Sequence, residues 1–158
     1  MNPAAVLSCL SCSIVSGVAT TPGGTVLETD RFHVHQDARH AIPGFMIVTT
    51  KRHLVAFDEL DEAEAVELAL ILRRVRRAQR GVLGTEHTHL LVNEDTRHHF
   101  HAWMLPKHPW MNAYGQGAEA MRAALIQSAS RPPTPAEREA TVEACARIRD
   151  TLAAPFHE

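Results

Sequence analysis

Residues 98–106 read HHFHAWMLP, in which His99 and His101 alternate with the apolar Phe100 and Ala102. Successive side chains on a β-strand point to opposite faces, so His99, His101 and Trp103 would share one face. The other face is apolar and suits a core, and it carries Phe100, Ala102 and Met104. The run predicts a strand over His99–Leu105, ended by the proline that follows. Two histidines on one face beside a polar loop indicate a candidate site, although a plain polar sheet face fits the same pattern.

The rest of the chain predicts an α+β fold. Short alternating or β-branched runs bounded by turn residues predict further strands. These strands are Thr25–Glu28, Phe32–Gln36, Phe45–Thr50 and Thr88–Asn93. Short turns join most of them. We therefore expect a five-stranded antiparallel sheet with a long helix packed on it and C-terminal helices.

The long helix is predicted to begin at Asp58 as its N-cap. Acidic residues load its first turns and a run of arginines loads its end, as suits a helix dipole. Gly81 and Gly84 act as stop signals. An apolar stripe at helical spacing comprises Leu68, Ile71, Leu72 and Val75. We interpret the arginines as a solvated helix end rather than a polyanion site. Two further helices are expected, over Glu119–Ser128 and from Thr134 or Pro135 to about Leu152.

Size and composition narrow the class of protein. The 158 residues fit one domain, with a core over residues 9–106 and a helical extension over 107–158. A formal net charge of -2 argues against a nucleic-acid binder that works by a basic surface. No apolar run reaches the length of a membrane helix, and no Lys or Arg opens the chain as in an export signal. We therefore expect a cytoplasmic protein that contacts neither nucleic acid nor membrane.

The cysteines form a poor disulfide set, because there are three: Cys9, Cys12 and Cys145. Cys9 and Cys12 make a C-x-x-C pair, whose thiolates can hold one side of a Zn²⁺ ion. The same spacing occurs in redox proteins, where it lies between a strand and a helix in a βαβ pattern that is missing here. Cys145 is predicted to be a small buried residue in a helix.

The run at residues 98–106 resembles the motif of the histidine-triad (HIT) superfamily, His-φ-His-φ-His-φ-φ with φ apolar, which is often followed by Pro. Aligned on Pro106, His99 is first, His101 second and Trp103 third, where the family has a histidine. The resemblance implies that His101 attacks the α-phosphate of a nucleotide. Tryptophan cannot shuttle a proton, so the leaving group is open. A second register, with Arg97, His99 and His101 as the three positions, would make His99 the nucleophile.

The resemblance also implies a metal site. Many bacterial members of the family place a Cys-x-x-Cys near the N-terminus and a histidine in a Lys-Lys-His element after the third strand. The corresponding residues are Cys9, Cys12, His53 and, as the first triad position, His99. This set is closed, so the zinc ion would be structural.

A nucleotide pocket follows from the same resemblance. Residues 37–44 are similar to the family element Asp-Ile-x-Pro-x-Ala-Pro-x-His. The resemblance implies that Asp37 accepts hydrogen bonds from the ribose hydroxyls, and the alternative is that Asp37 only caps its loop. Asn93 would orient the phosphate, with Arg97 as its anion ligand and Trp103 beside it. The remaining histidines are interpreted as structural or surface residues: His33, His35, His40, His87, His89, His98, His108 and His157.

Three functions compete. The first is a HIT-type hydrolase or transferase acting on a dinucleoside polyphosphate or a nucleoside phosphoramidate, with a purine nucleotide as partner. The second is a zinc-structured nucleotide-binding module with little turnover, which the tryptophan at position 103 and the short loop before residue 99 suggest. The third is a redox or metal-sensing protein that uses Cys9 and Cys12. The family resemblance also implies a homodimer.

Overall fold

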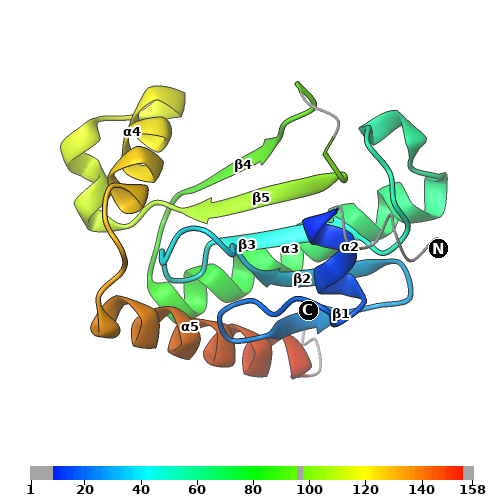
Figure 1. The fold of residues 1–158 in the computed structure, drawn as a ribbon, viewed down its shortest axis with the longest axis horizontal. Coiled ribbons are helices and arrows are strands. Elements are labelled where there is room, and N and C mark those ends of the chain that lie inside the picture. Colours follow the sequence, from blue (N-terminus) through cyan, green and yellow to red (C-terminus); the bar gives the residue numbers. More distant parts are fainter. Residues whose placement is uncertain (1–8, 96–97, 155–158) are drawn as a thin grey trace.

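Five strands form one antiparallel sheet in the order β1-β2-β3-β5-β4 (Figure 1). The computed structural model describes residues 9–95 and 98–154. The strands are β1 (Thr25–Glu28), β2 (Phe32–Gln36), β3 (Met46–Thr50), β4 (Thr88–Val92) and β5 (His101–Pro106). The expected α+β class and the five-stranded antiparallel sheet are confirmed.

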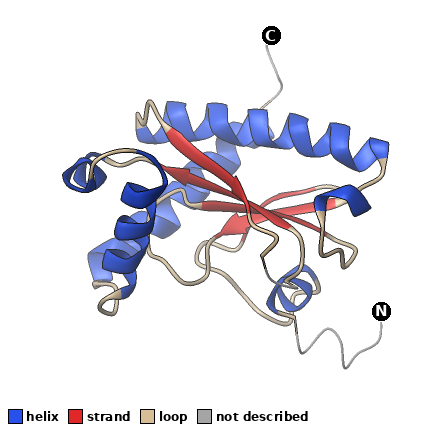
Figure 2. Cartoon of the chain, turned by 90° about the horizontal axis from the view of Figure 1, so that it is seen from above, coloured by secondary structure: helices blue, strands red, loops and turns tan. Residues whose placement is uncertain are grey.

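The helices lie on both sides of this sheet (Figure 2). They are α2 (Leu10–Val15), α3 (Glu62–Leu83), α4 (Gly117–Ala129) and α5 (Pro135–Ala153), with 3-10 helices η1 (Phe57–Glu59) and η2 (Pro109–Tyr114). Helices α3 and α5 pack on one face, where their apolar residues join those of the strands in one core. Helix α2 lies over the opposite face, beside β2 (Figure 1). None of the described helices is long and apolar enough to cross a membrane.

The main core lies between the sheet and helices α3 and α5. It contains the predicted inward residues of β5 and of the segment before it, and the stripe of α3: Phe100, Ala102, Met104, Leu68, Ile71 and Val75. Leu72 is half-buried against this core. Cys145 and Ile148 of α5 are fully buried in it. The predicted inward positions around β5 are therefore confirmed. On the other face of β5, Leu105 is buried in a second apolar cluster with Trp103 packed against it, and His101 is half-buried.

Two boundaries of α3 differ from the prediction. Asp61, not Asp58, caps the helix, because its Oδ1 accepts from the Glu64 N–H at 2.8 Å and Glu64 Oε2 accepts from the Asp61 N–H at 3.0 Å. Asp58 lies in η1 instead. Gly81 continues the helix, and Gly84 ends it at a φ of 65°.

Strand β5 begins two residues later than predicted. The Phe100 N–H donates to the main-chain oxygen of Leu54 at 2.7 Å, so this residue bonds a loop rather than a neighbouring strand. The arginines near the end of α3 are mostly solvated, as predicted: Arg73, Arg77 and Arg80 are exposed, and Arg76 is half-buried. Arg76 donates to the main-chain oxygens of Thr85 and Glu86 at 3.1 and 2.6 Å, because the chain turns back under the helix end.

Candidate metal centre and active site

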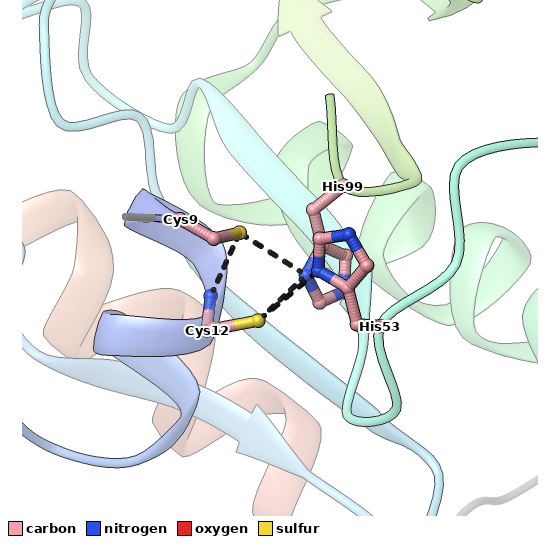
Figure 3. Close-up of side chains that lie close together, drawn as sticks. All are labelled: Cys9, Cys12, His53 and His99. Atoms are coloured by element: carbon pink, nitrogen blue, oxygen red, sulfur yellow. Dashed lines mark hydrogen bonds between the residues drawn. The ribbon is translucent and has the colours of Figure 1, made fainter. Parts of the chain in front are cut away.

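Four side chains predicted as metal ligands come together: Cys9, Cys12, His53 and His99 (Figure 3). Their ligand atoms all lie within 4.8 Å of one another. Cys12 Sγ is 3.2 Å from His53 Nδ1 and 3.4 Å from His99 Nδ1. A tetrahedral zinc ion with Zn–S near ~2.3 Å and Zn–N near ~2.0 Å sets sulfur and nitrogen ligands about 3.5 Å apart. The spacing therefore fits zinc.

Both thiols come from one turn at the start of α2. Cys9 is the N-cap, and its Sγ accepts from the Cys12 N–H at 3.4 Å. The C-x-x-C spacing places Cys12 on the same side of the turn, facing the two histidines (Figure 3). The predicted C-x-x-C pair thus lies at the start of a short helix that presents both sulfurs.

The tautomer of His99 suits metal binding. Its Nε2 lies 2.8 Å from the main-chain oxygen of Thr50, which can only accept, so Nε2 carries the proton. The lone pair is then on Nδ1, the atom that faces the sulfurs. Burial lowers the pKa of His99 to about 4, outweighing the hydrogen bond to Thr50, so the ring is neutral near pH 7. A neutral imidazole with a fixed tautomer is the form that binds a metal.

His53 is exposed on the loop after β3, and its neighbour anchors that loop to α3. Arg52 donates from Nε and Nη2 to the two carboxylate oxygens of Glu64, both at 2.6 Å. The Glu64 side chain is only 4% exposed. A bidentate pair of this kind restricts the position of the loop, and so of His53.

The four residues fit a structural zinc ion. All four positions of a tetrahedron are filled by protein, with none left for water or substrate. Two thiolates and two neutral imidazoles are also the donor set that zinc prefers. The ion would join α2 to the segment that leads into β5.

A second group of predicted residues lines a cavity of about 330 Å³ on the same sheet face. These residues are Asp37, Asn93, His101 and Trp103. His101 is half-buried, and its Nδ1 lies 2.7 Å from the main-chain oxygen of His99. Because a carbonyl oxygen only accepts hydrogen bonds, Nδ1 of His101 carries the proton and donates, and Nε2 of this tautomer presents a lone pair. His99 itself belongs to the metal cluster and is absent from the cavity lining, so His99 and His101 have separate places.

Trp103 stands beside His101, with ring centroids 6.0 Å apart, and packs edge-on against Phe45 at 5.6 Å. Its Nε1 is buried and has no hydrogen-bond partner in the described part of the chain. Indole N–H donates and cannot accept. The cavity therefore holds one unpaired donor next to an imidazole lone pair.

Asp37 caps its own loop, as the alternative interpretation proposed. Its Oδ2 accepts from the N–H groups of Arg39 and His40 and from His40 Nδ1, at 2.7 to 2.9 Å. Burial alone would raise the pKa of Asp37, but the hydrogen bonds from His40 and Arg39 outweigh it and lower the pKa. The carboxylate is thus ionised near pH 7. No described residue bonds its Oδ1, which leaves an acceptor at the cavity.

The loop before residue 99 is only partly described. Asn93 is exposed, and its Oδ1 accepts from the Asp95 N–H at 3.1 Å. Glu94 accepts from the Phe57 N–H at 2.6 Å, so its carboxylate is bonded to η1. Arg97, the predicted anion ligand, lies outside the described residues.

Three histidines interpreted as structural or surface residues also line the cavity: His35, His40 and His98. His35 is fully buried on β2. The face of the sheet on which it lies could be inferred from the sequence, because β2 alternates. Phe32 and Val34 enter the core, so His33 and His35 must face the same side of the sheet as His101.

Comparison with known proteins identifies the fold. No family model matches the chain, and no curated protein matches it. Among solved structures, a Zn-bound histidine triad family protein from Mycobacterium smegmatis is 23% identical with a TM-score of 0.67, covering 93% of this chain and 94% of its own. A hypothetical histidine triad nucleotide-binding protein from Sulfolobus tokodaii is 19% identical with a TM-score of 0.65, covering 91% of each chain. A Hit-like protein involved in cell-cycle regulation from Bartonella henselae is 15% identical with a TM-score of 0.64, covering 90% of this chain and 95% of its own. This chain therefore has the fold of the histidine-triad proteins.

Proposed function

We propose that this protein is a zinc-structured member of the HIT superfamily that cleaves a purine nucleotide through His101. The observation that carries the proposal is the hydrogen bond from His101 Nδ1 to the His99 main-chain oxygen at 2.7 Å. It directs the unprotonated Nε2 of a half-buried imidazole toward a cavity that also contains an ionised Asp37. A fixed neutral imidazole is a competent nucleophile near pH 7.

The reaction has two steps. His101 Nε2 attacks the α-phosphorus of the nucleotide, an N–P bond forms, and the bond to the leaving group breaks with its electron pair on that group. The Nδ1 proton stays on the ring, where the His99 oxygen stabilises the positive charge. Water then attacks the phosphorus and the N–P bond breaks with its electron pair returning to Nε2. The proton that the water loses passes to solvent, and a nucleoside monophosphate is released with His101 restored.

The other cavity residues hold the substrate. Asp37 Oδ1 accepts from the ribose hydroxyls, while Oδ2 remains bonded to its loop. Trp103 Nε1 donates to a phosphate oxygen, and Asn93 and Arg97 contact the phosphate from the loop. The zinc ion, once bound by its four ligands, supplies structure and no chemistry. The resemblance also leads us to propose a homodimer.

The leaving group follows from Trp103. The leaving group of a phosphoramidate is an amine, which needs a proton as the P–N bond breaks, and an indole cannot supply that proton. The leaving group of a dinucleoside polyphosphate is a nucleotide, which departs as a stable phosphate anion and needs no proton. We therefore place the dinucleoside polyphosphates first among substrates, followed by the phosphoramidates.

The test compares wild type with His101→Ala. Both are incubated with diadenosine and diguanosine polyphosphates and with phosphoramidates, and released monophosphate is measured by chromatography. We expect release by wild type and a loss of at least ~10³-fold in the variant. His87→Ala, which changes an exposed histidine outside the cavity, should keep full activity. Nucleotide binding without release from any compound would leave a binding module in place of the enzyme.

A further inference from the structure

His35 has one ring nitrogen without a protein partner. The residue lies on β2 with 3% of its surface exposed and lines the active-site cavity. Its Nδ1 is 2.8 Å from the main-chain oxygen of Gln36. Because a carbonyl oxygen only accepts, Nδ1 carries the proton and Nε2 presents a lone pair. Nε2 is buried and unpaired within residues 9–95 and 98–154.

The charge state of His35 keeps this acceptor in place. Burial lowers the pKa of His35 to about 4, although the hydrogen bond to Gln36 raises it. The ring is therefore neutral near pH 7, and Nε2 stays an acceptor. Buried acceptors without donors are rare in folded proteins. With Trp103 Nε1 unpaired in the same cavity, the missing hydrogen bonds indicate a ligand that carries its own polar groups.

The sheet register places His35 across the cavity from the nucleophile. His35 pairs with Ile47 on β3, and Ile47 pairs with Trp103 on β5. Two strand spacings of ~4.8 Å put His35 about 10 Å from Trp103. His101 lies on the same face of β5, two residues before Trp103. A ligand whose phosphate is at His101 must therefore span two strands to reach His35, so its nucleoside part lies there.

We propose that His35 determines base specificity by accepting a hydrogen bond from the exocyclic amino group of a purine, an inference that rests on the proposed nucleotide function. The ribose hydroxyls already have Asp37 as their acceptor, which leaves the base for His35. An amino group gives the N–H that Nε2 lacks. A base without that group leaves Nε2 buried and unpaired, so it binds more weakly.

The test measures binding by calorimetry on the zinc-loaded protein, using two pairs of nucleotides. AMP is compared with purine riboside 5′-monophosphate, which lacks the 6-amino group, and GMP with IMP, which lacks the 2-amino group. We expect wild type to favour the amino compound of one pair by roughly 10- to 100-fold. His35→Phe should reduce this preference to less than ~3-fold, since Phe keeps the ring and loses the acceptor. His35→Gln, which keeps an acceptor, should retain part of it.

His33→Phe is the matched control. His33 is equally buried on the same face of β2 but is absent from the cavity lining, so the preference should not change. A merely structural role of His35 would weaken both members of a pair equally and leave their ratio intact, which would overturn the proposal. Equal binding within both pairs by wild type would overturn it too, even if His35→Phe failed to fold. No nucleotide binding at all would overturn the proposed function itself.

Discussion

Removing one zinc ligand should destabilise the chain without unfolding its core. The sharpest change is Cys9→Ser. Cys9 is the N-cap of α2, and serine is a favoured N-cap residue, so the helix start is preserved while a thiolate ligand is lost. Cys9 is also only half-buried, so little packing changes.

The size of the effect follows from linkage and from the position of the cluster. Zinc at a thousand times its Kd stabilises the folded state by about 4 kcal/mol. In a chain of this size, each kcal/mol lowers the Tm by about 2 to 4 °C, so the loss should be about 8 to 16 °C. The main core lies on the opposite face of the sheet from α2, so the protein should still fold.

The assay combines metal analysis with calorimetry. Purified wild type should contain one zinc ion per chain, and a chelator should lower its Tm to that of Cys9→Ser. Chelator should have little further effect on the variant. Cys145→Ala is the matched control: it removes a buried cysteine outside the cluster and should keep its zinc. Wild type purified without zinc, and unaffected by added zinc, would refute the reasoning.

Three other changes follow from the structure. Glu64→Gln breaks the pair with Arg52, which is half-exposed, and should cost about 1–2 kcal/mol at pH 7 in urea unfolding. The hydrogen bond from Arg52 lowers the pKa of Glu64, so the stability from this pair is present above the pKa of glutamate in the unfolded chain, ~4.3, and is lost as the pH falls. The unfolding free energies of wild type and variant should therefore converge in acid. A difference between them that stays constant with pH would contradict the assignment. Gly23→Ala should lower the free energy of unfolding by about 2–5 kcal/mol, because the φ of Gly23 is +75° and the new Cβ would lie 2.5 Å from Cys145 Cβ. Gly17 has the same φ but open space around it, so Gly17→Ala should lower it by only about 1–2 kcal/mol. Equal losses in the two variants would argue against the contact with Cys145. Trp103→His places a proton donor in the cavity and should raise phosphoramidate turnover by at least ~10-fold relative to dinucleoside polyphosphate turnover, whereas an unchanged ratio would separate Trp103 from the leaving group.

The sheet and the metal cluster could be predicted because they depend on local spacing. Alternation around His101 determines which side chains enter the core, and this held although β5 begins later than expected. The C-x-x-C spacing places two thiols on one turn of α2. The partners His53 and His99 came from the family resemblance, since no local pattern relates residues so far apart in the chain.

The start of α3 and the place of His35 in the cavity lining could not be predicted from the sequence, for different reasons. Several acidic residues precede α3, and the choice between Asp58 and Asp61 depends on the reciprocal hydrogen bonds with Glu64. Taken singly, a histidine on a strand such as His35 has no sequence feature that distinguishes it from a structural or surface residue. Its position in the cavity follows only from the register that aligns β2, β3 and β5, because residues from several segments form the cavity.

His99 serves two neighbours through two different parts of itself. Its ring faces the sulfurs, while its main-chain oxygen accepts a hydrogen bond from His101 Nδ1. Every amino acid has that oxygen, so no substitution at position 99 can delete the group that orients the nucleophile. A change of side chain at position 99 would affect His101 only if the main chain at residue 99 moved. A substitution at position 99 therefore removes the zinc ligand and keeps the carbonyl that orients His101. The distance from this carbonyl oxygen to His101 Nδ1, which is 2.7 Å here, shows how far the backbone has moved.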